Sequence, residues 1–68
     1  MEATNDIQVE HHGSLYLFRP STDDAKKWLE DHTEGQWIGG ALAVEPRYAH
    51  DLASGAVTEG GLTVGGRL

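Results

Sequence analysis

Apolar and polar residues alternate near the start of the chain in the manner of a strand with one buried face. Residues 7–11 have the sequence IQVEH, a pattern typical of a half-buried strand. After Gly13, residues 15–18 (LYLF) are all apolar, so both sides of the strand are apolar and we expect it to lie inside the sheet rather than at its edge. Because the connection is short and contains glycine, we expect the two strands to form a hairpin. Pro20 is expected to end the second strand.

A helical pattern follows over residues 22–33. Its apolar face has spacings of three, four and seven residues, made by Ala25, Trp28, Leu29 and His32. Ser21 and Thr22 each offer a hydroxyl group that could cap the N-terminus of this helix. A capping role explains Ser21 better than a role as a catalytic nucleophile. Two aspartates in the first turn suit the positive end of the helix dipole. Gly35 is expected to stop this helix.

The second half of the chain predicts a strand, a helix and a last strand. Residues 41–44 (ALAV) form the strand, and Gly39-Gly40 before it are expected to form a bend or a bulge. Pro46 suits the first position of a helix, whose apolar stripe is Tyr48, Ala49, Leu52, Ala53, Ala56 and Val57. Residues 62–64 predict the last strand. Residues 1–6 and 65–68 are expected to be flexible ends.

This order, ββαβαβ, predicts one α+β domain spanning residues 1–68. Two crossovers of the same hand that progress in one direction place both helices on one face of the sheet. We therefore expect a two-layer α/β sandwich, in which a mixed sheet of three or four short strands carries two helices on one face. Some aromatic bulk would line the open face, where an apolar patch would mark an interface with a partner or a second copy.

Composition limits the classes of function that fit this chain. The 68 residues include no cysteine, which excludes disulfides, thiol nucleophiles and cysteine-ligated metals. The longest apolar runs have four residues, whereas a membrane-spanning helix needs about 20. Residues 1–10 contain no apolar block, so no secretory signal is expected and a cytoplasmic location is predicted.

The charge is negative and unevenly distributed. Of the formal net charge of −6, residues 1–35 contribute eight acids and three bases (−5), and residues 36–68 contribute three acids and two bases (−1). Such a field disfavours direct binding to nucleic acid or anionic membranes and favours a basic partner surface. A charge of this size is also typical of a small domain kept soluble by its surface.

The candidates for metal binding or acid–base catalysis are four histidines: His11, His12, His32 and His50. They form no HExxH motif and no i,i+4 pair, and the helix dipole alone explains His32. The serines lack a GxSxG motif, and the paired glycines match no phosphate-binding loop. We therefore assign no catalytic, cofactor-binding or metal-ligating residue and expect a protein that is not an enzyme.

Two resemblances follow from short motifs. Gly65-Gly66 near the end of a small chain resembles the ubiquitin-like and sulfur-carrier proteins, but Arg67-Leu68 follow, and the further hairpin of those folds is missing after the third predicted strand. The strings EHHGSLYLFRP (residues 10–20) and GGALAVEPRY (residues 39–48) resemble short uncharacterised bacterial and phage-associated proteins. This second resemblance implies a compact bacterial domain and transfers no activity or functional residue.

The function expected from the sequence is binding to another protein with a basic surface, or to a second copy of this chain. The candidate contact residues are Tyr16, Trp37, Arg47 and Tyr48, with Trp37 as the main aromatic anchor because it lies outside a clear periodic element. One alternative is an acidic phage-type inhibitor that mimics nucleic acid through Asp23, Asp24, Glu30, Asp31 and Glu34. Another is a small His-dependent enzyme or metal-binding protein.

Overall fold

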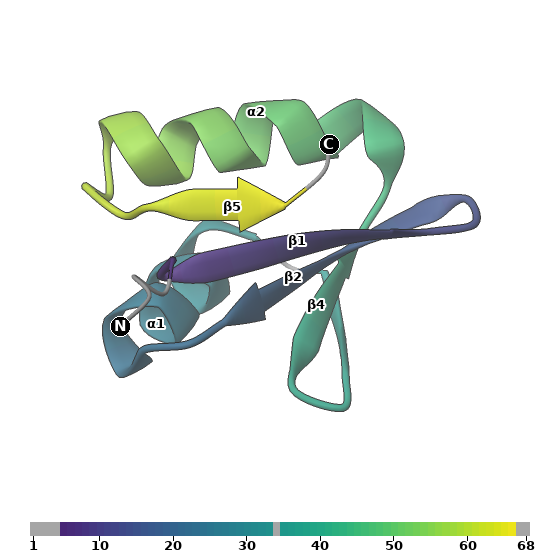
Figure 1. The fold of residues 1–68 in the computed structure, drawn as a ribbon, viewed down its shortest axis with the longest axis horizontal. Helices are drawn as coiled ribbons and strands as arrows, with labels where there is room; N and C mark the ends of the chain where they lie inside the picture. Colours follow the sequence, from purple (N-terminus) through teal and green to yellow (C-terminus); the bar gives the residue numbers. More distant parts are fainter. Residues whose placement is uncertain (1–4, 34, 67–68) are drawn as a thin grey trace.

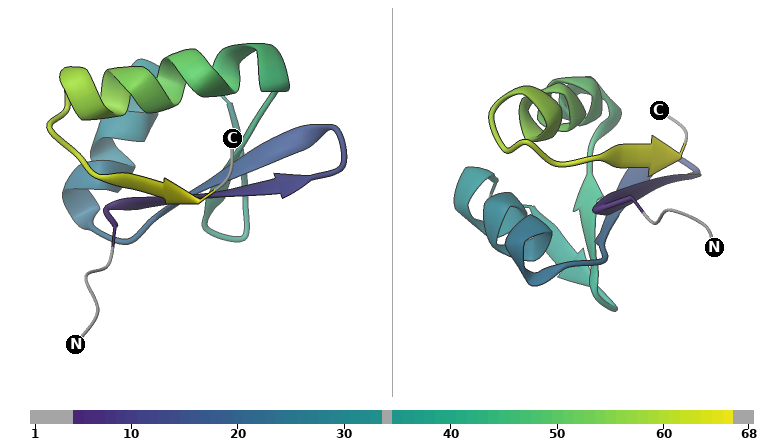
Figure 2. Two further views of the ribbon diagram at one scale, coloured as in Figure 1. Left: turned by 45° about the horizontal axis from the view of Figure 1, so that its top comes forward. Right: turned by 60° about the vertical axis from the view of Figure 1, so that its left-hand side comes forward.

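The fold is a five-stranded mixed sheet with two helices on one face (Figures 1 and 2). The computed structural model describes residues 5–33 and 35–66. In chain order the elements are β1 (Ile7–His12), β2 (Leu15–Pro20), α1 (Asp23–His32), β3 (Gln36–Ile38), β4 (Ala41–Val44), α2 (Pro46–Thr58) and β5 (Val64–Gly66). The strands lie in the order β3-β4-β2-β1-β5. The α+β class is confirmed, but the predicted order ββαβαβ lacks one strand.

The strand that the prediction missed is β3, so the sheet has five strands rather than three or four. Gly39 and Gly40 have φ values of 55° and 84°, and positive φ at both positions is what a two-residue type I′ turn requires. The paired glycines therefore join β3 to β4 as a hairpin, with Ile38 opposite Ala41. Three residues are too few for an alternating pattern to show in the sequence.

The hydrophobic core lies between the sheet and the helices. β2 occupies the centre of the sheet between β1 and β4, as predicted, with Val9 opposite Phe18 and Phe18 opposite Leu42. The largest fully buried side chains are those of Ile7, Phe18, Leu29 and Leu42. Gly13, with a φ of 61°, supplies the turn of the predicted β1–β2 hairpin.

Both helices lie within one residue of their expected starts, with different capping details. The N-cap of α1 is Thr22 rather than Ser21, because the Thr22 Oγ1 accepts a hydrogen bond of 3.1 Å from the Ala25 amide. Ser21 instead donates its hydroxyl to the Asn5 carbonyl at 2.6 Å. Pro46 opens α2 as predicted, but only the alanines of its apolar stripe are buried: Ala49, Ala53 and Ala56.

The two crossovers run in opposite directions along the sheet, not in one direction as expected. The β2–α1–β3 connection moves toward one edge, and the β4–α2–β5 connection returns to the other. Since β4 is antiparallel to β2, two crossovers of the same hand that run in opposite directions still place their helices on one face. Figure 2 shows both helices on that face.

The last strand lies further along the chain than predicted. It comprises Val64–Gly66 instead of residues 62–64, and Gly65 and Gly66 pair in parallel with Gln8 and Val9 of β1 instead of forming a loose tail. A Cβ at Gly65 would meet the Asn5 side chain, and one at Gly66 would meet the Val9 backbone. Because the Val9 backbone cannot move aside and the φ of Gly66 is 104°, the close strand approach requires glycine at residue 66, whereas the Asn5 side chain could rotate away from a Cβ at residue 65. Residues 1–4 and 67–68 of the predicted flexible ends lie outside the described residues.

Candidate functional site

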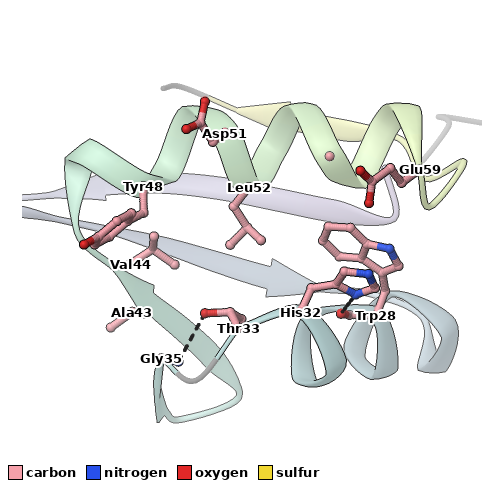
Figure 3. Close-up of a pocket in the computed structure, with 11 residues that line it drawn as sticks. Trp28, His32, Thr33, Gly35, Ala43, Val44, Tyr48, Asp51, Leu52 and Glu59 are labelled. Atoms are coloured by element: carbon pink, nitrogen blue, oxygen red, sulfur yellow. Dashed lines mark hydrogen bonds between the residues drawn. The ribbon is translucent and has the colours of Figure 1, made fainter.

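A groove of about 760 Å³ separates α1 from α2 and has β4 as its floor (Figure 3). We call it the interhelical groove. Its volume is within the range of about 300–1,000 Å³ that is typical of ligand pockets, but it is open to solvent. Eleven residues line it: Trp28, His32, Thr33, Gly35, Ala43, Val44, Tyr48, Asp51, Leu52, Gly55 and Glu59.

Trp28 and His32 of α1 form a stacked pair in the groove. Their ring centroids are 4.1 Å apart with an interplanar angle of 15°, as the i,i+4 spacing of a helix allows. His32 Nδ1 lies 2.8 Å from the Trp28 carbonyl oxygen; because a carbonyl can only accept, this nitrogen carries the proton. The Trp28 ring reaches α2 beside Gly55, whose added Cβ would lie 3.5 Å from the ring. The indole is therefore held on both sides.

Tyr48 and Leu52 of α2 form the other apolar part of the groove. Figure 3 shows both side chains pointing from α2 into the groove, with Val44 of β4 below Tyr48. The Tyr48 side chain is 55% exposed, and the Arg47 guanidinium lies 5.0 Å from its ring centroid. Arg47 also donates from Nε to Glu45 Oε1 at 3.1 Å, so its charge is already paired at the surface.

The polar groups around the groove are mainly acidic. Asp51 and Glu59 contribute two carboxylates, and His32 is the one basic side chain among the eleven lining residues. α1 ends at His32, so the negative end of its dipole lies in the same place. A ligand with an apolar group and a positive charge would therefore be complementary to this groove.

The four contact residues predicted from the sequence are not brought together. Tyr48 lines the groove, with Arg47 beside it on the first turn of α2. Tyr16 packs against the core from β2 and stacks on His11 with ring centroids 4.6 Å apart. Trp37 is half-buried on β3 and packs against the core, opposite Leu42. Neither Tyr16 nor Trp37 is among the groove residues.

The sequence did not indicate the other half of this site. Helical spacing assigned Trp28 to the core, and the structure places it both against the core and in the groove. Asp51 lies outside the apolar stripe predicted for the second helix, and no sequence pattern pointed to it. The Trp28–His32 spacing was the one local signal, because stacking of two rings at i,i+4 follows from helix geometry.

The histidines lie in three separate places. His12 and Arg19 both contact Glu10 Oε1, at 3.0 and 3.3 Å, and these hydrogen bonds hold the pKa of Glu10 below its ordinary value. His32 is in the groove, and His50 is exposed on α2. Over residues 5–33 and 35–66, no three His, Asp or Glu side chains are arranged to hold a metal ion. No helix in the same residues is long and apolar enough to cross a membrane.

Comparisons with protein-family models, curated proteins and solved structures return no match for this chain. The likeness to short bacterial and phage-associated proteins therefore stays a prediction, as does the likeness to ubiquitin-like proteins. The interhelical groove and the distribution of charge are the features that bear on function.

Proposed function

We propose that this protein is a non-enzymatic binding module that holds a basic segment of another protein in the interhelical groove. The observation that carries the proposal is the combination of an open, mainly apolar groove with two carboxylates among its lining residues. An apolar floor with a few polar groups around it is the usual composition of a binding site. The partner expected is a segment with one large apolar side chain next to lysine or arginine.

The apolar side chain of the partner would lie over Val44 and Leu52, between the Tyr48 ring and the Trp28 ring. Aromatic residues in such a position supply much of the binding energy of an interface. Full burial of one aliphatic or aromatic side chain contributes about 1.5–3 kcal/mol. The stacking of Trp28 on His32 and its contact with α2 hold the ring in place before binding, which lowers the entropy cost of association.

The cation of the partner would be attracted by Asp51 and Glu59, and over longer distances by the net charge of −6. Long-range attraction of this kind mainly increases the association rate and is screened by salt. We therefore expect the apolar contact to provide most of the affinity and the carboxylates to select basic segments.

The test is a selection of random dodecamer peptides displayed on phage against the immobilised wild-type protein. We expect the enriched peptides to share an apolar residue flanked by lysine or arginine. A ¹⁵N-labelled sample titrated with the strongest peptide should show its largest shift changes at groove residues of α1 and α2. Enrichment of acidic peptides, or no enrichment, would contradict the proposal, as would shift changes confined to the opposite face of the sheet.

A matched pair of α2 variants tests the groove directly. Tyr48→Ala should weaken binding of the selected peptide by about tenfold or more, or at least 1.4 kcal/mol. Val57→Ala, at a residue of the same helix with similar exposure and outside the groove lining, should leave it within about twofold. The salt dependence of binding distinguishes this proposal from the nucleic-acid-mimic alternative, because binding by such a mimic would weaken steeply as the ionic strength rises.

A further inference from the structure

The sheet has a second face that neither α1 nor α2 covers (Figure 2). Register assigns the residues on it, because directly opposite residues in neighbouring strands point to the same side. Ile7, Val9, Phe18 and Leu42 belong to the core under the helices, so their neighbours in the strands point the other way. We call this surface the open sheet face: Gln8, Glu10, His12, Leu15, Leu17, Arg19, Gln36, Ile38, Ala41 and Ala43, of which Ala43 also borders the interhelical groove at the edge of β4.

One part of the open sheet face is apolar. Leu17 of β2 lies opposite Ala43 of β4, and Ile38 of β3 lies opposite Ala41, which is fully buried and adds no exposed surface. Leu15 extends this patch along β2. Ile38 is 52% exposed, and Leu15, Leu17 and Ala43 are half-buried. Apolar side chains exposed together on one sheet face are a candidate interaction site.

The net charge of the open sheet face favours a second copy of this chain as its partner. Its two formal charges are those of Glu10 and Arg19, which pair at 3.3 Å, so the face has no net formal charge. The other acids in the described part of the chain lie in α1, α2 and the residues that join the elements: Asp6, Asp23, Asp24, Glu30, Asp31, Glu45, Asp51 and Glu59. Two copies with a net charge of −6 each repel one another. The open sheet face is where they can approach with the least repulsion.

We propose that two copies of this chain associate through their open sheet faces about a two-fold axis. A two-fold contact brings the same patch together from both copies, and Ile38, Leu17 and Ala43 would pack between two sheets about 10 Å apart. Both helical layers would then lie on the outside of the dimer. Each dimer would present two interhelical grooves to solvent, although the dimer does not depend on what those grooves bind.

The expected dimer is reversible. A standard interface covers about 800 Å² of each partner, which is a large share of the 4609 Å² surface of this small chain. Because the patch is only partly apolar and contains the Glu10–Arg19 pair, we expect a dissociation constant of about 10–100 µM. Raising the salt concentration should leave the dimer unchanged or strengthen it, since salt screens the repulsion between the two acidic chains.

The experiment is sedimentation velocity of the full chain from about 5 to about 500 µM, with two variants matched in exposure and charge. The wild-type protein should pass from monomer to dimer in this range. Ile38→Glu should weaken the dimer by about tenfold or more, because two carboxylates would face each other across the contact. Val57→Glu adds the same charge at a 51% exposed position on α2 and should leave the dimer intact.

Circular dichroism and thermal unfolding establish that each variant is folded. If Ile38→Glu does not fold, Leu15→Glu at the other end of the patch replaces it, with the same expected loss. A wild-type protein that stays monomeric at every concentration would overturn the proposal. So would a dimer that Val57→Glu disrupts while Ile38→Glu and Leu15→Glu leave it intact, since its interface would then lie on the helical side.

Discussion

At the scale of single residues, the Glu10 carboxylate links its own strand to the neighbouring one, because it contacts both His12 of β1 and Arg19 of β2. It lies on β1 next to β2 and its Oε1 accepts from His12 Nε2 at 3.0 Å and Arg19 Nη2 at 3.3 Å. The hydrogen bond from His12 and then the one from Arg19, with the Arg19 charge, hold the pKa of Glu10 below its ordinary value of 4.5. The ionised carboxylate is therefore favoured by the folded state.

The lowered pKa of Glu10 predicts how the stability of the fold changes with pH. Since the pKa of Glu10 is lower in the folded than in the unfolded protein, ionised Glu10 stabilises the fold above its ordinary pKa of 4.5, and this contribution is lost as the pH falls through the lower folded value. A ¹³C NMR titration of its carboxyl carbon should have a midpoint below 4.5. Arg19→Ala should move the midpoint upward. A wild-type midpoint at or above 4.5 would contradict this account.

At the scale of elements, the Trp28 side chain packs against α2 and limits which residues fit at two positions near the end of that helix. The helix contains Gly55 and is followed by Gly60, and both glycines face the indole. Their surroundings differ: a Cβ at Gly55 would lie 3.5 Å from Trp28 Cη2, an ordinary contact. A Cβ at Gly60 would lie 2.8 Å from the Ala56 carbonyl oxygen and 2.9 Å from Trp28 Nε1. One glycine is therefore replaceable and the other is not.

We expect the two alanine variants to change stability in opposite directions. Gly55→Ala should raise the free energy of unfolding by about 0.5–1 kcal/mol, because alanine loses less backbone entropy in a helix. Gly60→Ala should lower it by about 1 kcal/mol or more, because the helix end or the indole must move. Urea denaturation of both variants measures the difference. Equal effects at the two positions would show that the indole does not distinguish them.

Elements also show where sequence patterns were sufficient. The residues of α1 carry both an amphipathic spacing and a cap, so the predicted range of 22–33 nearly coincides with Asp23–His32. The hairpin at Gly13 was equally well marked. By contrast, β3 has three residues, and Trp37 in it is contacted from elements distant in the sequence. Its strand character comes from pairing with β4, which local periodicity does not encode.

At the scale of the whole molecule, hydrogen bonds join the two ends of the fold. The Asp6 amide donates to Thr63 Oγ1 at 2.9 Å, and the Thr63 amide donates to Asp6 Oδ2 at 3.0 Å. The Ser21 amide donates to the Asp6 carbonyl at 2.8 Å. These contacts bring the start of β1, the end of β2 and the approach to β5 to one point. The short edge strand β5 depends on this point because it pairs with β1 alone.

Removing the Asp6 side chain should therefore loosen β5 before the rest of the sheet. Asp6→Ala is expected to lower the free energy of unfolding by about 1–2 kcal/mol, since the Thr63 amide loses a charged acceptor. Hydrogen exchange of the Val64–Gly66 amides should accelerate more than that of β2. Asp6→Asn keeps an oxygen acceptor and should restore much of the protection. Uniform acceleration over all strands would mean that β5 does not open separately.

The sequence by itself determined the features that depend on near neighbours: the hairpin at Gly13, the capped helix after Thr22 and the start of α2 at Pro46. Their physical basis is local, in glycine and proline torsion angles and in the spacing of apolar side chains. Only the tertiary structure decided that Trp28 and Tyr48 line one groove, and that Leu17 and Ile38 share one uncovered face. These pairs lie on separate elements, and the packing of five strands and two helices sets the distance between them.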